Sequence, residues 1–323
     1  MMPAIFSFSV GLAVMLISAK VFLDVSTEFS AKWKFSPLFI SLVLVALGTN
    51  LPELTVTIAA LRHADPGLAM GNIVGSSIAN ITIILGAATL FGKVKIGTTK
   101  TQINAFLLLV VTFIFSILAL SAVATIYKII LLLSAVFLTF SYEYIMAVNG
   151  RKHEDKKLLK LIEKLNNKKK KYPAIVYVIM FFGSLTGLGF GGNVTVDSIA
   201  ELSKILGLST TILGLTLTAV ATSLPELLTS IIASKKKDNK VVLGTLIGSN
   251  IFNLTLFAAI ILNYTTDFRI KKFVSIKEIF FLIFSTLIFY IIVKKYSGKV
   301  ITKEISLLFI TIFAVFSVFI FYL

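Results

Sequence analysis

The sequence predicts an all-α polytopic membrane protein whose ten transmembrane helices form two inverted five-helix repeats. Three observations support this fold class. The 323 residues are 57% hydrophobic and only 14% charged, whereas about a quarter of the residues in a soluble domain are charged. Apolar runs of about 20 residues, the length that crosses a bilayer, recur along the chain. A polar motif from the first half also returns in the second half.

The apolar runs divide five and five around one long polar stretch, residues 151–172, which is dense in Lys and Glu. The predicted spans are residues 3–24, 37–61, 68–91, 102–122, 124–148, 173–193, 208–234, 241–262, 274–293 and 301–322. Residues 1–150 and 173–323 are therefore expected to be the two repeats. Residues 151–172 are expected to be a basic cytoplasmic linker, with a calmodulin-type or lipid-contacting role as the alternative.

The first run, residues 3–24, is interpreted as a spanning helix rather than a secretory signal peptide. A signal peptide places positive charge before its apolar core and a small-residue cleavage site after it. The chain is apolar from Met1 to Ala19, and its first charged residue, Lys20, follows that stretch instead of preceding it.

The distribution of Lys and Arg predicts the orientation. With the N-terminus outside, the inside loops hold 23 of these residues and the outside loops hold 7. Cytoplasmic loops carry the excess of positive charge. Both termini are therefore expected outside and the 151–172 linker in the cytoplasm, although the loop near residues 269–277 disagrees.

Composition excludes several functions. The chain has no cysteine and two histidines, His63 and His153, so thiolate chemistry and multi-histidine metal sites are excluded. No histidine lies within a predicted span, so an intramembrane enzyme lacks a base for its nucleophile. The net charge of +16 resides in short loops between apolar runs, and it does not indicate nucleic-acid binding. No cofactor is expected.

An internal repeat is the strongest signal in the sequence. Residues 46–54, Ala-Leu-Gly-Thr-Asn-Leu-Pro-Glu-Leu, return 173 residues later at 219–227 as Ala-Val-Ala-Thr-Ser-Leu-Pro-Glu-Leu. The same offset aligns Gly71 with Gly244 and Asn80 with Asn253. Matching Pro, Glu, Gly and Asn is not expected from chance similarity between Leu-rich helices. Because five spans is an odd number, the second copy enters the membrane from the opposite side. Secondary transporters often have such inverted repeats, with ion sites near the midplane.

Glu53 and Glu226 lie at equivalent places in the two copies, each within an apolar span. A charged residue at the centre of a membrane helix costs about 2.5–3.5 kcal/mol on insertion scales. No Lys or Arg lies in the facing segments, so a metal cation or a proton must neutralise the carboxylates. Pro52 and Pro225 would also free backbone carbonyls nearby, which a cation can satisfy. A simple proline kink is the alternative for either copy alone.

The ligands near the two glutamates are all hard oxygens, which suit Ca²⁺ or Na⁺ and not Zn²⁺ or Cu⁺. Hydroxyl or amide oxygens and freed carbonyls from both copies complete the candidate set, namely Thr49, Thr222, Asn50, Ser223, Ala46 and Ala219.

A second repeated motif follows each glutamate. Gly71 and Gly75 match Gly244 and Gly248, and such spacing permits close helix approach in membranes. Hydroxyl and amide oxygens share one helix face in each copy and would complete side sites for Na⁺; these are Ser76, Asn80, Ser249 and Asn253. Interhelical hydrogen bonding alone is the alternative for them.

The paired motifs resemble the two alpha repeats of the Ca²⁺/cation antiporter superfamily and are most similar to those of prokaryotic Na⁺/Ca²⁺ exchangers. The resemblance implies that Glu53, Glu226, Thr49 and Thr222 bind Ca²⁺. It implies Na⁺ sites that share the glutamates and use Ala46, Ala219, Ser76 and Ser249, with Asn80 and Asn253 lining the central site. It further implies electrogenic exchange of three Na⁺ for one Ca²⁺, with the first and sixth helices sliding to give alternating access.

Three residues depart from the family pattern, namely Asn50 in place of Ser, Ala221 in place of Gly and Thr245 in place of Asn. A neutral Asn253 favours K⁺ independence, and the Leu-Pro-Glu core favours Na⁺ over H⁺ as driver. The sequence therefore predicts a Ca²⁺/Na⁺ antiporter in the cell membrane. Its partners are these ions and the lipid bilayer, with a monomer as functional unit. An H⁺/Ca²⁺ or other divalent-cation antiporter is the alternative, and an intramembrane enzyme or a channel is a third hypothesis.

Overall fold

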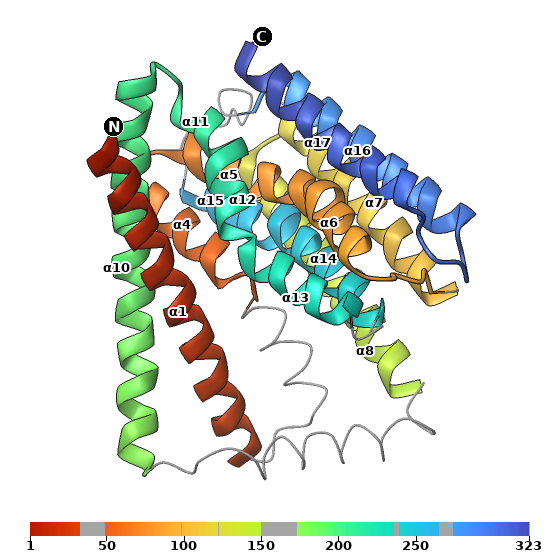
Figure 1. Ribbon diagram of the computed structural model, residues 1–323, viewed down its shortest axis with the longest axis horizontal. Helices are drawn as coiled ribbons and strands as arrows, with labels where there is room; N and C mark the ends of the chain where they lie inside the picture. The colour runs from red at the N-terminus through yellow and green to blue at the C-terminus, as the bar shows by residue number, and fades with distance from the viewer. Residues whose placement is uncertain are drawn as a thin grey trace.

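The computed structural model describes residues 1–32, 49–97, 99–121, 123–149, 173–235, 239–264 and 274–322, and it is built from helices (Figure 1). Eight helices in this part are long and apolar enough to cross a membrane, or up to nine if one bent pair is a single span. The all-helical membrane fold is therefore confirmed. Residues 37–48 of the predicted span 37–61 lie outside the described residues, so the count of ten remains a prediction, as does the role of residues 151–172.

The first half contains α1 (Met2–Lys32), α4 (Leu51–Arg62), α5 (Pro66–Ala79), η2 (Asn80–Ile84), α6 (Leu85–Phe91), α7 (Thr99–Leu120) and α8 (Thr125–Asn149). The second half contains α10 (Ala174–Leu206), α11 (Thr210–Leu213), η3 (Gly214–Thr218), α12 (Ala219–Thr222), α13 (Leu224–Lys235), α14 (Asn239–Phe252), η4 (Asn253–Phe257), α15 (Ala258–Tyr264), α16 (Ile276–Lys295) and α17 (Lys303–Tyr322). The three η segments are π-helical turns inside longer helical rods. Such turns are often found at functional sites.

Two helices extend beyond the predicted spans 3–24 and 173–193. Helix α1 continues to Lys32 and α10 to Leu206. Asp24, Glu28, Asp197 and Glu201 therefore lie inside long helices. Helical backbone satisfies its own hydrogen bonds, so a helix can extend past the apolar segment that composition identifies.

Helix bounds repeat between the halves with the same offset as the sequence motif. Helices α4, α5 and α6 begin and end 173 residues before α13, α14 and α15, and η2 precedes η4 by the same number. The match includes the position of the wide π-turn, which composition does not reveal. The two halves therefore share their local structure as well as their residues.

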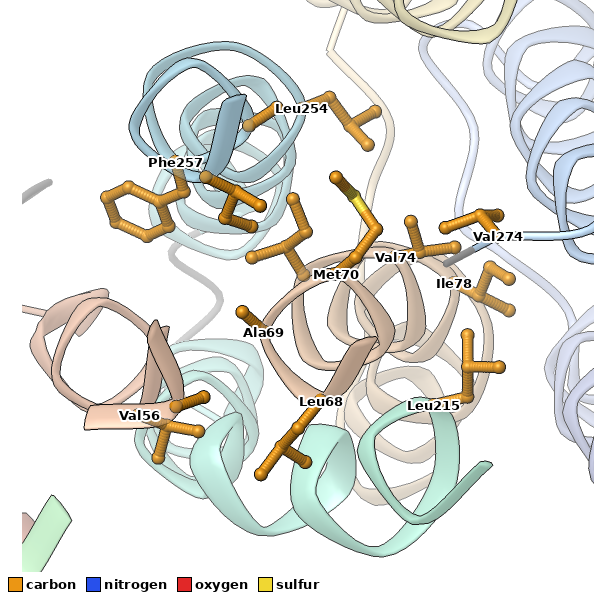
Figure 2. Close-up of a cluster of buried hydrophobic side chains, with 14 of the residues drawn as sticks. Val56, Leu68, Ala69, Met70, Val74, Ile78, Leu215, Leu254, Phe257 and Val274 are labelled. Atoms are coloured by element: carbon orange, nitrogen blue, oxygen red, sulfur yellow. The ribbon is translucent and has the colours of Figure 1, made fainter. Parts of the chain in front are cut away.

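Helix α5 forms the centre of the molecule. Every residue from Gly67 to Ala79 is buried, as expected for a helix that is enclosed on all sides. Figure 2 shows its side chains radiating toward Leu254 and Phe257 on one side and Leu215 on another. The functional motif of the first half is thus held by a packed core.

Close backbone contact joins α5 to the segment α11–η3–α12. A Cβ atom added to Gly71 would lie 2.5 Å from the carbonyl oxygen of Thr211, and one added to Gly75 would lie 2.4 Å from that of Leu215. The predicted role of these two glycines in close helix approach is confirmed. Their small size brings the two repeats together beside the glutamates.

Helices α1 and α10 run side by side along one edge of the molecule, and much of their length stands apart from the other helices (Figure 1). Small residues bring the two backbones close, because a Cβ on Gly191 would lie 2.7 Å from the Gly11 carbonyl oxygen. Outward-facing side chains on both helices are large and apolar, including Phe6, Ile17 and Phe182. The pair is therefore suited to lie in lipid.

Candidate cation site

The two Leu-Pro-Glu motifs mark the starts of half-helices rather than kinks in continuous helices. Helix α12 ends at Thr222 and α13 begins at Leu224, with an angle of 42° between the two helical segments at the break. In the first copy, α4 begins at Leu51 after the N-cap residue Asn50. Proline fits the first helical turn, where its missing N–H has no intrahelical partner to lose.

Glu53 and Glu226 consequently lie in the first turn of α4 and α13. They were predicted at the middle of a span, and the break converts that position into a helix N-terminus. The N-terminus of a helix carries partial positive charge, which stabilises a carboxylate there. Both side chains are buried, with 1% and 0% of their surface exposed. Neither faces the surrounding lipid.

The two carboxylates converge and are held by residues of the opposite repeat. Ser223 Oγ donates to Glu53 Oε1 at 3.1 Å, and Thr222 lies near the same carboxylate. Thr49 and Glu53 lie near the carboxylate of Glu226. Each glutamate is thus oriented by the motif of the other half, which makes one shared site.

Ser249 supplies a further contact, because its Oγ donates to Glu226 Oε1 at 3.2 Å. The second oxygen of each carboxylate, Oε2 of Glu53 and of Glu226, is buried without a hydrogen-bond donor. Burying a carboxylate oxygen without a partner is costly. A cation between the two glutamates would remove this cost.

The carboxylates have no third acidic partner in the part of the chain that the structure describes, where no group of three or more His, Cys, Asp or Glu could hold a metal ion. The remaining candidate ligands are neutral oxygens. A site with two carboxylates and several neutral oxygens matches the requirements of Ca²⁺, which takes six to eight oxygen ligands.

Ser76, Ala219 and Thr222 form a second group beside the glutamates. Ser76 Oγ donates to the Ala219 carbonyl at 3.3 Å and lies 3.5 Å from Thr222 Oγ1. The same carbonyl accepts from the Ser223 N–H at 3.2 Å and lies 3.3 Å from Thr222 Oγ1, whose single proton is shared with Asn72 Oδ1. The carbonyl that the sequence predicted to be free is thus already hydrogen-bonded. The group still places three oxygens from both repeats together.

Asn80 and Asn253 begin the π-turns η2 and η4 and are buried, with 1% and 0% exposure. Asn80 Nδ2 donates to Asn250 Oδ1 at 2.9 Å. Both polar side-chain atoms of Asn253 lack a hydrogen-bond partner. Two buried amides at equivalent positions therefore differ in how firmly they are held.

Of the twelve predicted site residues, Ala46 lies outside the described residues. The structure describes the other eleven on the elements that meet between the repeats; these are Thr49, Asn50, Glu53, Ser76, Asn80, Ala219, Thr222, Ser223, Glu226, Ser249 and Asn253.

Sequence reasoning missed four buried polar residues close to this site. Asn72 accepts a hydrogen bond from Thr222 at 3.2 Å, and Asn250 bonds Asn80. Thr57 and Ser230 lie one turn beyond each glutamate and leave their hydroxyls without a partner. The last pair could have been found, because the two residues are equivalent under the 173-residue offset and both carry hydroxyls.

Comparisons with known proteins agree with this arrangement. A family model described as "Sodium/calcium exchanger protein" matches residues 3–148 and 176–322. An uncharacterized membrane protein of Methanocaldococcus jannaschii is 30% identical over 250 residues, which cover 76% of this chain and 77% of that protein. The sodium/calcium exchanger MaX1 of Methanosarcina acetivorans is 25% identical over 277 residues, with coverage of 76% and 79%.

A solved structure is similar along almost the whole chain. The sodium-calcium exchanger NCX_Mj, soaked with Na⁺ and Sr²⁺, superposes with a TM-score of 0.63 over 97% of this chain and 96% of its own, at 23% identity. At this identity the likeness supports the fold.

Proposed function

The chain belongs to the sodium/calcium exchanger family of the Ca²⁺/cation antiporter superfamily, and on this premise we propose that it exchanges Ca²⁺ for Na⁺ across the cell membrane. The observation that carries the proposal is the convergence of Glu53 and Glu226, each buried and each with one carboxylate oxygen lacking a donor. Family membership supports cation exchange, and the ligand chemistry supports these two ions.

The transported cations are the counter-charge of the site. Two carboxylates supply up to two negative charges, which match one Ca²⁺. Glu53, Glu226, Thr49 and Thr222 would bind Ca²⁺. Na⁺ also prefers hard oxygens, so Ala46, Ala219, Ser76 and Ser249 would hold it with the same glutamates. Asn50, Ser223, Asn80 and Asn253 would line the remaining walls.

Alternating access is proposed to follow from inverted halves, residues 1–150 and 173–323. The repeated helix bounds support two equivalent units, and an odd number of spans in each would invert them. The lipid-facing pair α1 and α10 would slide past the packed core. We place both termini outside and residues 151–172 in the cytoplasm, with the monomer as functional unit. Exchange of three Na⁺ for one Ca²⁺ would move net charge.

A driver-ion assay tests this function. Purified protein in liposomes loaded with Na⁺ should take up radioactive Ca²⁺ after dilution into Na⁺-free buffer, because outward Na⁺ movement supplies the energy. A K⁺ shunt through valinomycin should accelerate uptake, since three Na⁺ leaving for each Ca²⁺ makes the interior negative. Equal uptake in Na⁺-free vesicles under a proton gradient would instead identify an H⁺/Ca²⁺ antiporter.

A further inference from the structure

A chain of two hydrogen bonds connects the repeats next to the glutamates. Asn250 Nδ2 donates to the backbone carbonyl of Ser77 at 2.8 Å. Asn80 Nδ2 donates to Asn250 Oδ1 at 2.9 Å. Ser77, Asn80 and Asn250 are at most 1% exposed. These two hydrogen bonds connect α14 to α5 in an interior where water does not compete for them.

Only one assignment of donor and acceptor atoms fits these two hydrogen bonds. The oxygen and nitrogen of an amide are hard to tell apart by position alone, so their assignment has to come from the hydrogen-bond network. A backbone carbonyl only accepts, so the Asn250 nitrogen must face Ser77 and its oxygen must face Asn80. Asn80 must then present its nitrogen to Asn250. The Asn80 oxygen, which has no hydrogen-bond donor, is therefore turned away from Asn250.

We propose that Asn250 is a positioning residue that fixes the amide of Asn80 with its oxygen turned toward the cation. The inference rests on the proposed function, in which Asn80 lines the central site. Ser76 lies one turn before Asn80 and contacts Thr222, while the neighbour of Asn250, Ser249, donates to Glu226. A cation needs the amide oxygen and is repelled by the NH₂ group, so the orientation decides whether Asn80 is a ligand.

No equivalent hydrogen bond holds the second repeat's amide, Asn253, so the site is asymmetric. Ser77 occupies the position equivalent to Asn250, and its hydroxyl donates to the Ile73 carbonyl of its own helix at 2.8 Å. Asn253, the equivalent of Asn80, has no hydrogen bond on either polar atom. The site thus combines one amide whose orientation is set by a hydrogen bond with one that has no such bond.

Ca²⁺ binding by the purified full chain tests the proposal. Asn250→Ala should raise the Ca²⁺ Kd about tenfold, in keeping with the loss of one ligand-strength interaction. The same substitution made in an Asn80→Asp background should change the Kd by less than about twofold, compared with Asn80→Asp alone. Aspartate has oxygen at both ends, so its orientation no longer matters.

Two further variants separate positioning from folding. Asn250→Leu removes both hydrogen bonds and keeps most of the side-chain volume. If gel filtration shows that Asn250→Ala is partly unfolded, Asn250→Leu takes its place and should show the same rise in Kd of about tenfold. Ser77→Ala is the control from the equivalent position of the first repeat. It keeps the Ser77 carbonyl and should leave the Kd unchanged.

Equal losses of Ca²⁺ affinity with and without the Asn80→Asp substitution would show that Asn250 only supports the fold, and would overturn the inference. An unchanged Kd in Asn250→Ala would also overturn it. Either result would leave the proposed function standing if the wild type exchanges Ca²⁺ for Na⁺. A wild type that binds Ca²⁺ without exchanging it would overturn the function and leave the binding test of Asn250 intact.

Discussion

Replacing Glu53 or Glu226 by glutamine should abolish Na⁺-driven Ca²⁺ uptake, with a loss of at least about 100-fold, or about 2.8 kcal/mol. Glutamine keeps the size of the side chain and removes one of the two charges. It also places an NH₂ group at an oxygen position of a site built from converging oxygens. Initial rates in Na⁺-loaded proteoliposomes measure the loss.

Glu304→Gln is the matched control for these substitutions. Glu304 lies in the first turn of α17 and is exposed to solvent, so the same change of chemistry should leave uptake unaltered. Gel filtration of all three variants checks that they fold. If either buried variant kept more than about a third of the wild-type rate, the two carboxylates would not be the shared site.

Gly75→Ala should destabilise the protein by about 1–3 kcal/mol, the usual cost of overpacking, and lower the exchange rate at least about tenfold. The new Cβ would lie 2.4 Å from the Leu215 carbonyl oxygen and 2.7 Å from the Ala219 Cβ. Both are fixed by helical backbone, so α5 must move away from η3 and α12. The movement separates Ser76 from the Ala219 carbonyl.

Thermal unfolding monitored by intrinsic fluorescence, together with Na⁺-driven uptake, measures both effects. Gly183→Ala in α10 is the control, because Gly183 is exposed and its added Cβ meets no atom within 4 Å. Wild-type stability in Gly75→Ala would mean that the close approach of the two repeats is not required. Alanine favours a helix over glycine, so Gly183→Ala should not lose stability. A loss of equal size in Gly183→Ala would show that the effect in Gly75→Ala does not come from the close contact.

The sequence predicted the helical membrane fold and its family because both can be recognised from hydrophobic composition and from short sequence motifs. Apolar length identifies spans whatever their packing, and the paired Leu-Pro-Glu motifs identify the family. It did not predict that α1 and α10 continue to Lys32 and Leu206, since polar residues end an apolar run without ending a helix. The break at Ser223 was hidden inside the continuous apolar segment 208–234.

Within the site, agreement between the two halves was the main signal for a candidate residue, although Thr57 and Ser230 also agree and were missed. Glu53 and Glu226 were found because each supports the other under the repeat. Asn72 and Asn250 were missed because the equivalent residues are Thr245 and Ser77, so the repeat gives no signal for them. Their hydrogen bonds to Thr222 and Asn80 cross between repeats, and such contacts depend on tertiary structure.

The shared placement of the π-turns η2 and η4 makes the length of the helical rods around them critical in both halves. A π-turn accommodates an extra residue, and adding one residue to a regular helix rotates everything beyond it by about 100°. Leu51–Phe91 and Leu224–Tyr264 nevertheless keep the same length and the same wide turn. Both halves therefore turn the residues beyond Asn80 and Asn253 by the same amount. A one-residue insertion or deletion in either stretch would rotate the helix beyond it and carry its buried face out of the core, whereas a substitution leaves that register unchanged.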